Sequence, residues 1–232
     1  MKKLSKPKMI AVATTLTLAA GSASALTSAT FNLSGGDSTN YSLLPSSFNL
    51  SSGGIDANFA AGSFTSISVS GNTITSASFA SDPRIGRYFG GAGVTNSSGE
   101  AHWVDGYGRY DFIVMTFSVS VSIAELIFGY YDSSENFRWM YDSSGDGSIG
   151  VNDFISNSTN AGSDAKFSEF NPTGILSKVW AVGAFGRYDD WKFKAVTVNY
   201  EPSVVPLPAT GLLLAGALAG FGAMRRRKTK AA

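Results

Sequence analysis

The chain has 232 residues, with 18 Lys and Arg against 17 Asp and Glu, and it contains no cysteine, which excludes a disulfide framework and thiol chemistry. Nine of the basic residues lie within the first eight and last eight positions. The part between them carries nine basic and all 17 acidic residues, a net charge of −8. Such an acidic body argues against nucleic acid as a partner and would be repelled by anionic lipid.

The first 25 residues have the three parts of a secretory signal peptide. Four lysines precede position 9, and residues 9–20 are mostly apolar but short for a bilayer span. Ala23 and Ala25 then supply the small residues of a cleavage site. The sequence therefore predicts export with cleavage before Leu26, so residues 1–25 take no part in the predicted fold.

The body of the chain, residues 26–203, has the pattern of an all-β domain. As far as Gly62 it is rich in Ser, Asn and Gly with isolated apolar anchors, which indicates short strands and loops. Residues 64–70 and 73–79 alternate between apolar and polar on either side of Gly71-Asn72, which is typical of a β-hairpin. A looser, Gly-rich stretch follows over residues 81–99.

The strongest strand pattern begins at Tyr110. Every second residue from Ile113 to Ile123 is apolar, whereas the opposite parity turns polar after Val114, so one face should be fully buried. Apolar runs at 126–131, 137–141, 179–182 and 191–200 predict further strands, and no window of the body has sustained helical periodicity. We expect an antiparallel β-sandwich, jelly-roll-like in topology. Its predicted core includes Ile113, Met115, Phe117, Val119 and Trp191.

The last 29 residues, 204–232, form a tripartite tail. A proline motif precedes an apolar Gly/Ala/Leu run that ends at Met224, and a basic cluster follows. As a helix, residues 204–224 would extend about 31 Å, the thickness of the hydrocarbon core of a bilayer. The basic cluster should stay in the cytoplasm, which places the body outside it. The motif and the cluster consist of Val205, Pro206, Leu207, Pro208 and Ala209, and of Arg225, Arg226 and Arg227.

This tail resembles the VPLPA variety of the PEP-CTERM sorting signal of Gram-negative bacteria. The resemblance implies that a membrane-embedded exosortase recognises the tail of an inner-membrane precursor, removes it and releases the protein to the cell surface or extracellular matrix. The logic parallels that of a GPI signal, whose apolar tail is absent from the mature protein. The alternative is a single-span anchor that is never cleaved.

A second resemblance lies in residues 90–142. Gly93-Val94-Thr95-Asn96, Glu100 to Gly106 and Tyr110-Asp111-Phe112 are similar to a pattern of an exosortase-dependent surface-protein family, as is the later Phe128-Gly129-Tyr130-Tyr131. Gly106 stands where that family more often has Asn, so a role of that Asn is not carried over. The family is known mainly by its sorting tail, and the resemblance therefore implies location more than activity.

Glu100, His102 and Asp105 lie close together in the sequence, and His102 is the only histidine of the chain. They would suit acid–base chemistry or a metal. However, one histidine without cysteine makes a zinc site unusual, and no Gly-x-Ser-x-Gly turn presents a nucleophile. We favour a loop whose polar side chains hydrogen-bond the backbone before a strand. No coherent catalytic set is visible, so we expect no enzymatic activity.

Residues 142–153 fit the 12-residue calcium loop. Oxygen ligands stand at its positions 1, 3, 5, 7 and 12, and Gly147 occupies position 6, where a sharp turn is needed. Asp at position 12, in place of Glu, predicts low affinity, and the flanks read as strands and not as an EF-hand helix pair. The alternative is an acidic hairpin loop without metal. The candidate calcium ligands are Asp142, Ser144, Asp146, Ser148 and Asp153.

The four tryptophans are the last candidates for a site. A sugar-stacking platform is one interpretation of Trp103, Trp139, Trp180 and Trp191, but Trp180 and Trp191 lie in apolar strand patterns and are more simply core. We therefore expect an exported, non-enzymatic surface or matrix protein that associates with exopolysaccharide. The alternative function is a calcium-dependent carbohydrate-binding module.

Overall fold

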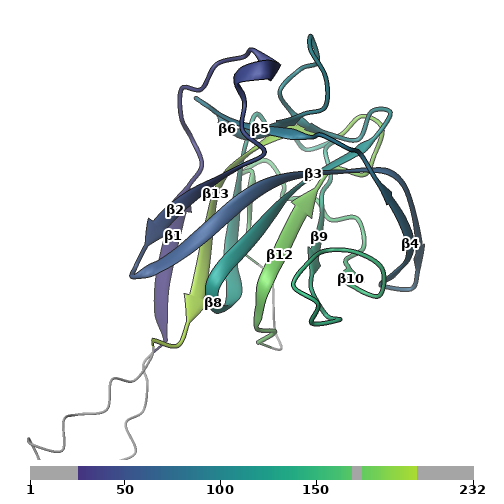
Figure 1. Cartoon of the computed structure of the whole chain (residues 1–232). Coiled ribbons are helices and arrows are strands. Elements are labelled where there is room, and N and C mark those ends of the chain that lie inside the picture. Colours follow the sequence, from purple (N-terminus) through teal and green to yellow (C-terminus); the bar gives the residue numbers. More distant parts are fainter. Residues whose placement is uncertain (1–25, 169–173, 203–232) are drawn as a thin grey trace, which may run out of the picture. The chain divides into compact units, whose positions relative to one another are not determined.

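The computed structural model describes residues 26–168 and 174–202 (Figure 1). The predicted signal peptide and sorting tail lie outside these residues. Apart from a 3-10 turn at Tyr41–Leu43, the regular structure of the described part consists of antiparallel β-strands, which confirms the predicted fold class. None of the described residues belongs to a helix with the length and apolar character needed to cross a membrane.

The strands form two layers that share one long strand. In the first layer β13 (Asp190–Tyr200) pairs with β1 (Thr27–Asn32), with the second half of β8 (Tyr110–Gly129) and with β6 (Gly91–Thr95). Its margins are β5 (Arg84–Tyr88), β7 (Val104–Asp105) and β11 (Lys166–Phe167).

The second layer is built around the first half of β8. This half lies between β3 (Ile55–Ser70) and β12 (Ser177–Gly183). The layer also contains β2 (Ser47–Ser52), β4 (Thr73–Phe79), β9 (Arg138–Tyr141) and β10 (Phe154–Ile155).

Strand β8 crosses from one layer to the other. Its pairing with β12 reaches Val121, and its pairing with β13 begins at Ser122. The runs that predicted two strands, at 110–117 and 126–131, therefore belong mostly to one strand of 20 residues. No Gly or Pro interrupts residues 110–128, so nothing in this segment forces a turn.

The main core lies between the two layers. The ring of Phe31 on β1 packs against Phe59 on β3 and Phe117 on β8, with centroid distances of 5.9 and 5.7 Å. The predicted core residues Ile113, Met115, Phe117 and Trp191 are buried, and Val119 is partly buried against this cluster. The sequence prediction of a sandwich core is thus confirmed, with Val119 at its margin.

A second core fills a closed ring of strands. The pairings run β3–β4–β10–β9–β12–β8 and return from β8 to β3. All six strands contribute to one apolar cluster: Phe64, Ile74, Phe112, Met140, Ile155, Val179 and Ala181, together with Ile149 of the loop after β9. The second layer therefore curls into a small ring beside the sandwich, which the sequence pattern did not indicate.

One of the two hairpins described next was predicted from the sequence, and the other was not. The β3–β4 hairpin turns at Gly71-Asn72 as predicted, with Gly71 in the left-handed region at φ +60°. The β5–β6 hairpin lies in the stretch interpreted as loose. There a Cβ atom on Gly93 would approach the carbonyl oxygen of His102 to 2.0 Å, so glycine is needed for packing although it weakens the strand signal.

Candidate ligand-binding site

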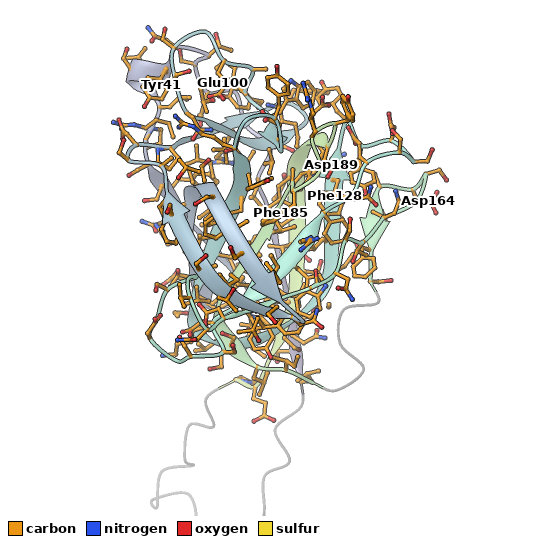
Figure 2. The ribbon with its side chains drawn as sticks, turned by 90° about the vertical axis from the view of Figure 1, so that its right-hand side faces the viewer. Tyr41, Glu100, Phe128, Asp164, Phe185 and Asp189 are labelled. Atoms are coloured by element: carbon orange, nitrogen blue, oxygen red, sulfur yellow. The ribbon has the colours of Figure 1, made fainter. Side chains whose placement is uncertain are left out.

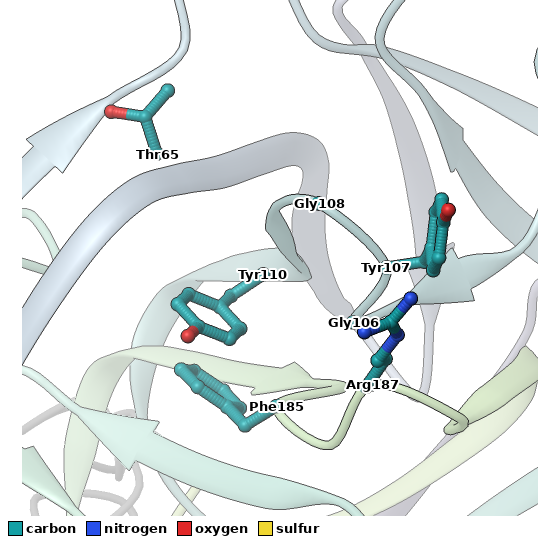
Figure 3. Close-up of a pocket in the computed structure, with 7 residues that line it drawn as sticks. All are labelled: Thr65, Gly106, Tyr107, Gly108, Tyr110, Phe185 and Arg187. Carbon is teal, nitrogen blue, oxygen red and sulfur yellow. The ribbon is translucent and has the colours of Figure 1, made fainter.

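The open end of the strand ring carries a hollow of about 470 Å³ (Figure 3). One wall is the aromatic pair Tyr110 and Phe185, whose rings stack at 5.6 Å with an interplanar angle of 14°. Thr65 on β3 lies across from them, and Tyr107 and Arg187 form the opposite side. Two loops, 106–109 after β7 and 184–189 after β12, thus supply most of the lining.

Glycines bring these two loops together. A Cβ atom on Gly106 would come within 2.1 Å of the carbonyl oxygen of Gly186, so the backbones meet where a side chain cannot fit. The buried carboxylate of Asp189 fixes the second loop, because it accepts from the backbone N–H of Gly186 at 2.6 Å and of Asn136 at 2.9 Å. Position 106 therefore has no room for a side chain.

An exposed Tyr–Arg–Tyr group forms the rim of the hollow. The Arg187 guanidinium carbon lies 5.4 Å from the ring centroid of Tyr107 and 5.9 Å from that of Tyr188. The two tyrosines are 67% and 85% exposed. Flat apolar faces beside a guanidinium suit a ligand that stacks and accepts hydrogen bonds, as a sugar ring does.

A second hollow, of about 300 Å³, lies on the other side of Tyr107 and Arg187, which line both. Glu100, Asp105 and Asp190 bring carboxylates to it, and Trp103 gives it an aromatic side. Burial raises the pKa of Asp105 to about 6. Figure 2 shows Glu100 and Asp189, which both line this hollow, towards the upper end of the domain in that view.

Lys192 is buried next to this second hollow. It is 6% exposed, and its Nζ lies 4.4 Å from the ring centroid of Tyr88 and 4.7 Å from that of Trp103. Burial lowers the pKa of Lys192 to about 7. In its protonated form Lys192 makes a cation–π contact with Trp103, which lies on the aromatic side of the hollow.

Each of the three polar side chains of this segment, Glu100, His102 and Asp105, is held by hydrogen bonds of its own. His102 Nδ1 pairs with the Thr95 hydroxyl at 2.8 Å, and its ring stacks on Tyr88 at 5.1 Å. Glu100 accepts from the backbone N–H groups of Asn96 and Ser97, and Asp105 accepts from that of Tyr107. This is the predicted loop of side chain–backbone hydrogen bonds, although Glu100 and Asp105 also reach the second hollow.

Asn96 and Asp111 join the same network at the start of β8. Asn96 Nδ2 donates to Asp111 Oδ1 at 2.8 Å. Asp111 is 1% exposed, and its Oδ2 faces the Ser63 hydroxyl without hydrogen-bond geometry. Burial raises the pKa of Asp111 to about 7. The Asn96–Asp111 hydrogen bond therefore connects the end of β6 to the start of β8 at this end of the domain.

The predicted calcium loop lies between two strands, β9 and β10, as the sequence indicated. Carboxylate oxygens of Asp142, Asp146 and Asp153 lie within 4.8 Å of one another. Gly147, at the position of the sharp turn, has φ +85°. Ser144 Oγ donates to Asp142 at 3.1 Å, and Ser148 donates to Asp146 from both its N–H and its hydroxyl.

Backbone groups also hold the calcium-loop carboxylates. Asp142 accepts from the N–H groups of Gly145 and Gly147, and the buried Asp153 accepts from those of Ser143, Ser144 and Gly150. Hydrogen bonds from Ser148 lower the pKa of Asp146, which favours its ionised form. The arrangement offers oxygen ligands to a hard cation such as calcium, and it also closes the loop by itself.

The tryptophans divide as the sequence suggested. Trp180 and Trp191 are core residues, and their indole N–H groups donate to backbone carbonyls. Trp139 is partly buried against the main core, whereas Trp103 lines the second hollow. The loop residues that line the hollows were not predicted from the sequence. The pattern that could have indicated them is an aromatic or Arg residue next to glycine, as in Gly106-Tyr107-Gly108 and in Arg187-Tyr188 after Gly186.

In comparisons with known proteins, the chain matches no protein-family model, no curated protein and no solved structure.

Proposed function

We propose that this chain is an exported, non-enzymatic surface or extracellular-matrix protein of a Gram-negative bacterium, and that it associates with exopolysaccharide. The observation that carries the binding role is the hollow with the stacked Tyr110–Phe185 wall and the exposed Tyr107–Arg187–Tyr188 rim. Aromatic faces and a fixed cation next to a cavity match the apolar faces and oxygen atoms of sugars.

Export and sorting rest on the two ends of the chain. The signal peptide and the tail with its proline motif support passage through the inner membrane and processing by an exosortase.

A jelly-roll-like topology of the sandwich strands stays a prediction.

Binding is proposed, and not catalysis, because of how the polar groups are engaged. The nitrogen His102 Nδ1 pairs with a threonine hydroxyl, and Asp189 is held by two backbone N–H groups. These contacts position loops, and the exposed rings of Tyr107 and Tyr188 beside Arg187 offer a surface on which a ligand can stack.

A glycan array with the body of the chain, residues 26–203, tests the binding role. We expect a defined set of glycans to bind, and Arg187→Ala together with Tyr188→Ala to abolish the signal. Leu176→Ala is the matched control, since Leu176 is an exposed apolar residue just before β12, away from the hollow. Absence of binding to any glycan, or equal binding by the double variant, would refute the proposal.

Calcium binding at residues 142–153 is a second candidate function, favoured by the convergence of three carboxylates. The affinity should fall in the extracellular range of about 0.1–1 mM, because an Asp stands where high-affinity loops have Glu. A ligand that binds only the folded state stabilises it by about 2.7 kcal/mol at 100 times its dissociation constant.

Thermal melting in chelator and in about 10 mM calcium tests this candidate. We expect a higher melting temperature with calcium, and no such shift after Asp142→Ala with Asp146→Ala. The calcium shift is compared within each protein, because these substitutions also remove loop hydrogen bonds. If the unaltered protein melts identically in chelator and in calcium, the loop is an acidic hairpin turn that does not bind calcium.

A further inference from the structure

The two hollows already described belong to one depression. Tyr107 and Arg187 line both, so their side chains form a low ridge between the aromatic hollow and the carboxylate hollow. A ligand in the first hollow that extends past this ridge enters the second. There it meets Trp103 on one side and the carboxylates of Glu100 and Asp190.

A third hollow, of about 540 Å³, continues beyond Trp103. Tyr130 lines it, and the Tyr130 ring meets the Trp103 ring edge-on at 5.4 Å. Phe89, at the turn of the β5–β6 hairpin, also lines it and is 89% exposed. The lining of this hollow is mainly apolar, with Lys194 at its side. The contact between Trp103 of the second hollow and Tyr130 of the third places these two hollows next to each other.

The backbone holds Tyr130 in this place at a conformational cost. Tyr130 has φ +54°, a left-handed conformation that is uncommon for a bulky residue. Its ring occupies the space over Gly90, where a Cβ atom would come within 2.1 Å of the ring. A strained backbone and a glycine beneath the ring together keep a large aromatic face next to the hollow.

We propose that the three hollows form one extended groove that binds several consecutive units of an uncharged polysaccharide chain. This inference rests on the proposed glycan binding and specifies its ligand: a long chain and not a single sugar or a chain end. Aromatic rings recur along the groove, from Tyr110 and Tyr107 through Trp103 to Tyr130 and Phe89. Such a series of aromatic rings offers stacking surfaces to successive sugar rings, and the polar groups of the lining can bind the hydroxyls.

The negative charge of the groove and of the body disfavours binding of acidic polysaccharides. The middle hollow presents Glu100, Asp105 and Asp190 against the single guanidinium of Arg187, and the body as a whole has a net charge of −8. A polymer of uronic acids would bring like charges to these carboxylates. Hydroxyl groups, by contrast, donate hydrogen bonds to carboxylates and accept them from Arg187.

Titration calorimetry with neutral cello- and manno-oligosaccharides of two to six units tests the groove, with oligogalacturonides as the anionic counterpart. The body of the chain is a suitable sample, because all residues of both core clusters lie between Ala29 and Tyr200. We expect the affinity for one neutral series to rise by at least about tenfold from two units to six, and oligogalacturonides to bind more weakly.

Variants in the third hollow separate the groove from the aromatic hollow. Tyr130→Asn with Phe89→Ser should remove the gain of the hexasaccharide and leave the disaccharide unchanged, since Asn tolerates the left-handed backbone at position 130. Arg187→Ala should weaken both lengths. The groove would be overturned if the affinity did not depend on oligosaccharide length, or if neither neutral series bound. It would also be overturned if the variant in the third hollow bound the hexasaccharide as tightly as the unaltered protein does. Absence of binding to every glycan of the array would instead refute the proposed function itself.

Discussion

At the scale of single residues, two buried charged groups decide how this end of the domain responds to pH. Asp111 and Lys192 are both almost fully buried, and neither stands out in the sequence, because each lies inside an otherwise apolar strand pattern. Alternation along one strand predicts which residues face a core. It does not reveal that loop 96–105 covers the outer side of β13, which is what buries Lys192 against Trp103.

Asp111→Asn should change the pH dependence of stability. Burial raises the pKa of Asp111 from 3.8 to about 7 in the folded state, so the folded protein binds the extra proton between these values. This contribution is complete below about pH 4 and is lost as the pH rises through about 7. The Asn variant lacks this loss. Its stability relative to the unaltered protein should therefore rise by up to about 4 kcal/mol between pH 4 and pH 8.

Urea unfolding at several pH values measures this effect, with Asp164→Asn, at an exposed side chain, as the control. The same pH slope in Asp111→Asn and in the unaltered protein would show that Asp111 is ionised in the folded state without cost. The lowered pKa of Lys192 changes the stability with pH in the opposite direction. Its lowered pKa of about 7 makes the folded protein more stable as the pH rises from 7 towards 10.5. The comparison therefore ends at pH 8.

At the scale of the elements, strand β8 is the part of the fold that the sequence predicted best. Its apolar parity predicts the buried face, since packing demands the same parity on one side of any sheet. Phe117→Ala should cost about 3–5 kcal/mol of unfolding free energy, because Phe117 is buried and packs on Phe31. Val119→Ala, at a partly buried position of the same face, should cost clearly less, and equal losses in urea titrations would contradict the observed burial.

The ring of strands and the binding site lie at the limit of what a single sequence predicts. The closure of β3, β4, β10, β9, β12 and β8 depends on pairings between distant segments, such as Phe154 with Thr73, and β10 has only two residues. Local propensity carries no such information. The candidate calcium loop could be predicted from the sequence because all its proposed ligands lie within 12 consecutive residues, and the structure brings three of its carboxylates together. The aromatic hollow was missed because its walls come from segments more than 70 residues apart, such as Tyr107 and Phe185.

At the scale of the whole molecule, the proposed signal peptide and sorting tail make a testable statement about where the body of the chain is delivered. If the sorting proposal is right, intact mass spectrometry of protein recovered from the cell surface should find a form that begins at Leu26 and ends near residues 206–209. Deletion of the exosortase should leave a heavier, membrane-bound precursor. A surface form that retains Arg225 to Arg227 would show a permanent anchor in place of a cleaved signal.

The positions of the two candidate sites predict that calcium and glycan bind independently. Asp142 donates its N–H to the carbonyl of Val179 near the start of β12, whereas Phe185 of the aromatic hollow lies just beyond the end of this strand. The strand residues from Val179 to Gly183 alone extend about 13 Å at about 3.3 Å per residue, and Phe185 lies beyond them. A calcium ion in the loop therefore cannot coordinate a sugar in the hollow. Both sites still contact the ring core, through Ile149 at the loop and Phe185 at the hollow.

Calcium should accordingly act on stability and not on recognition. Chelation should lower the melting temperature of the body, yet leave the dissociation constant of a bound oligosaccharide within about twofold when it is measured far below the melting transition. Calorimetry with and without calcium gives both quantities on one sample. A loss of glycan affinity of tenfold or more on chelation, in protein that is still folded by near-UV circular dichroism, would mean that the two ends of the ring are coupled. The calcium-dependent carbohydrate-binding module would then describe the protein better than two separate sites on one scaffold.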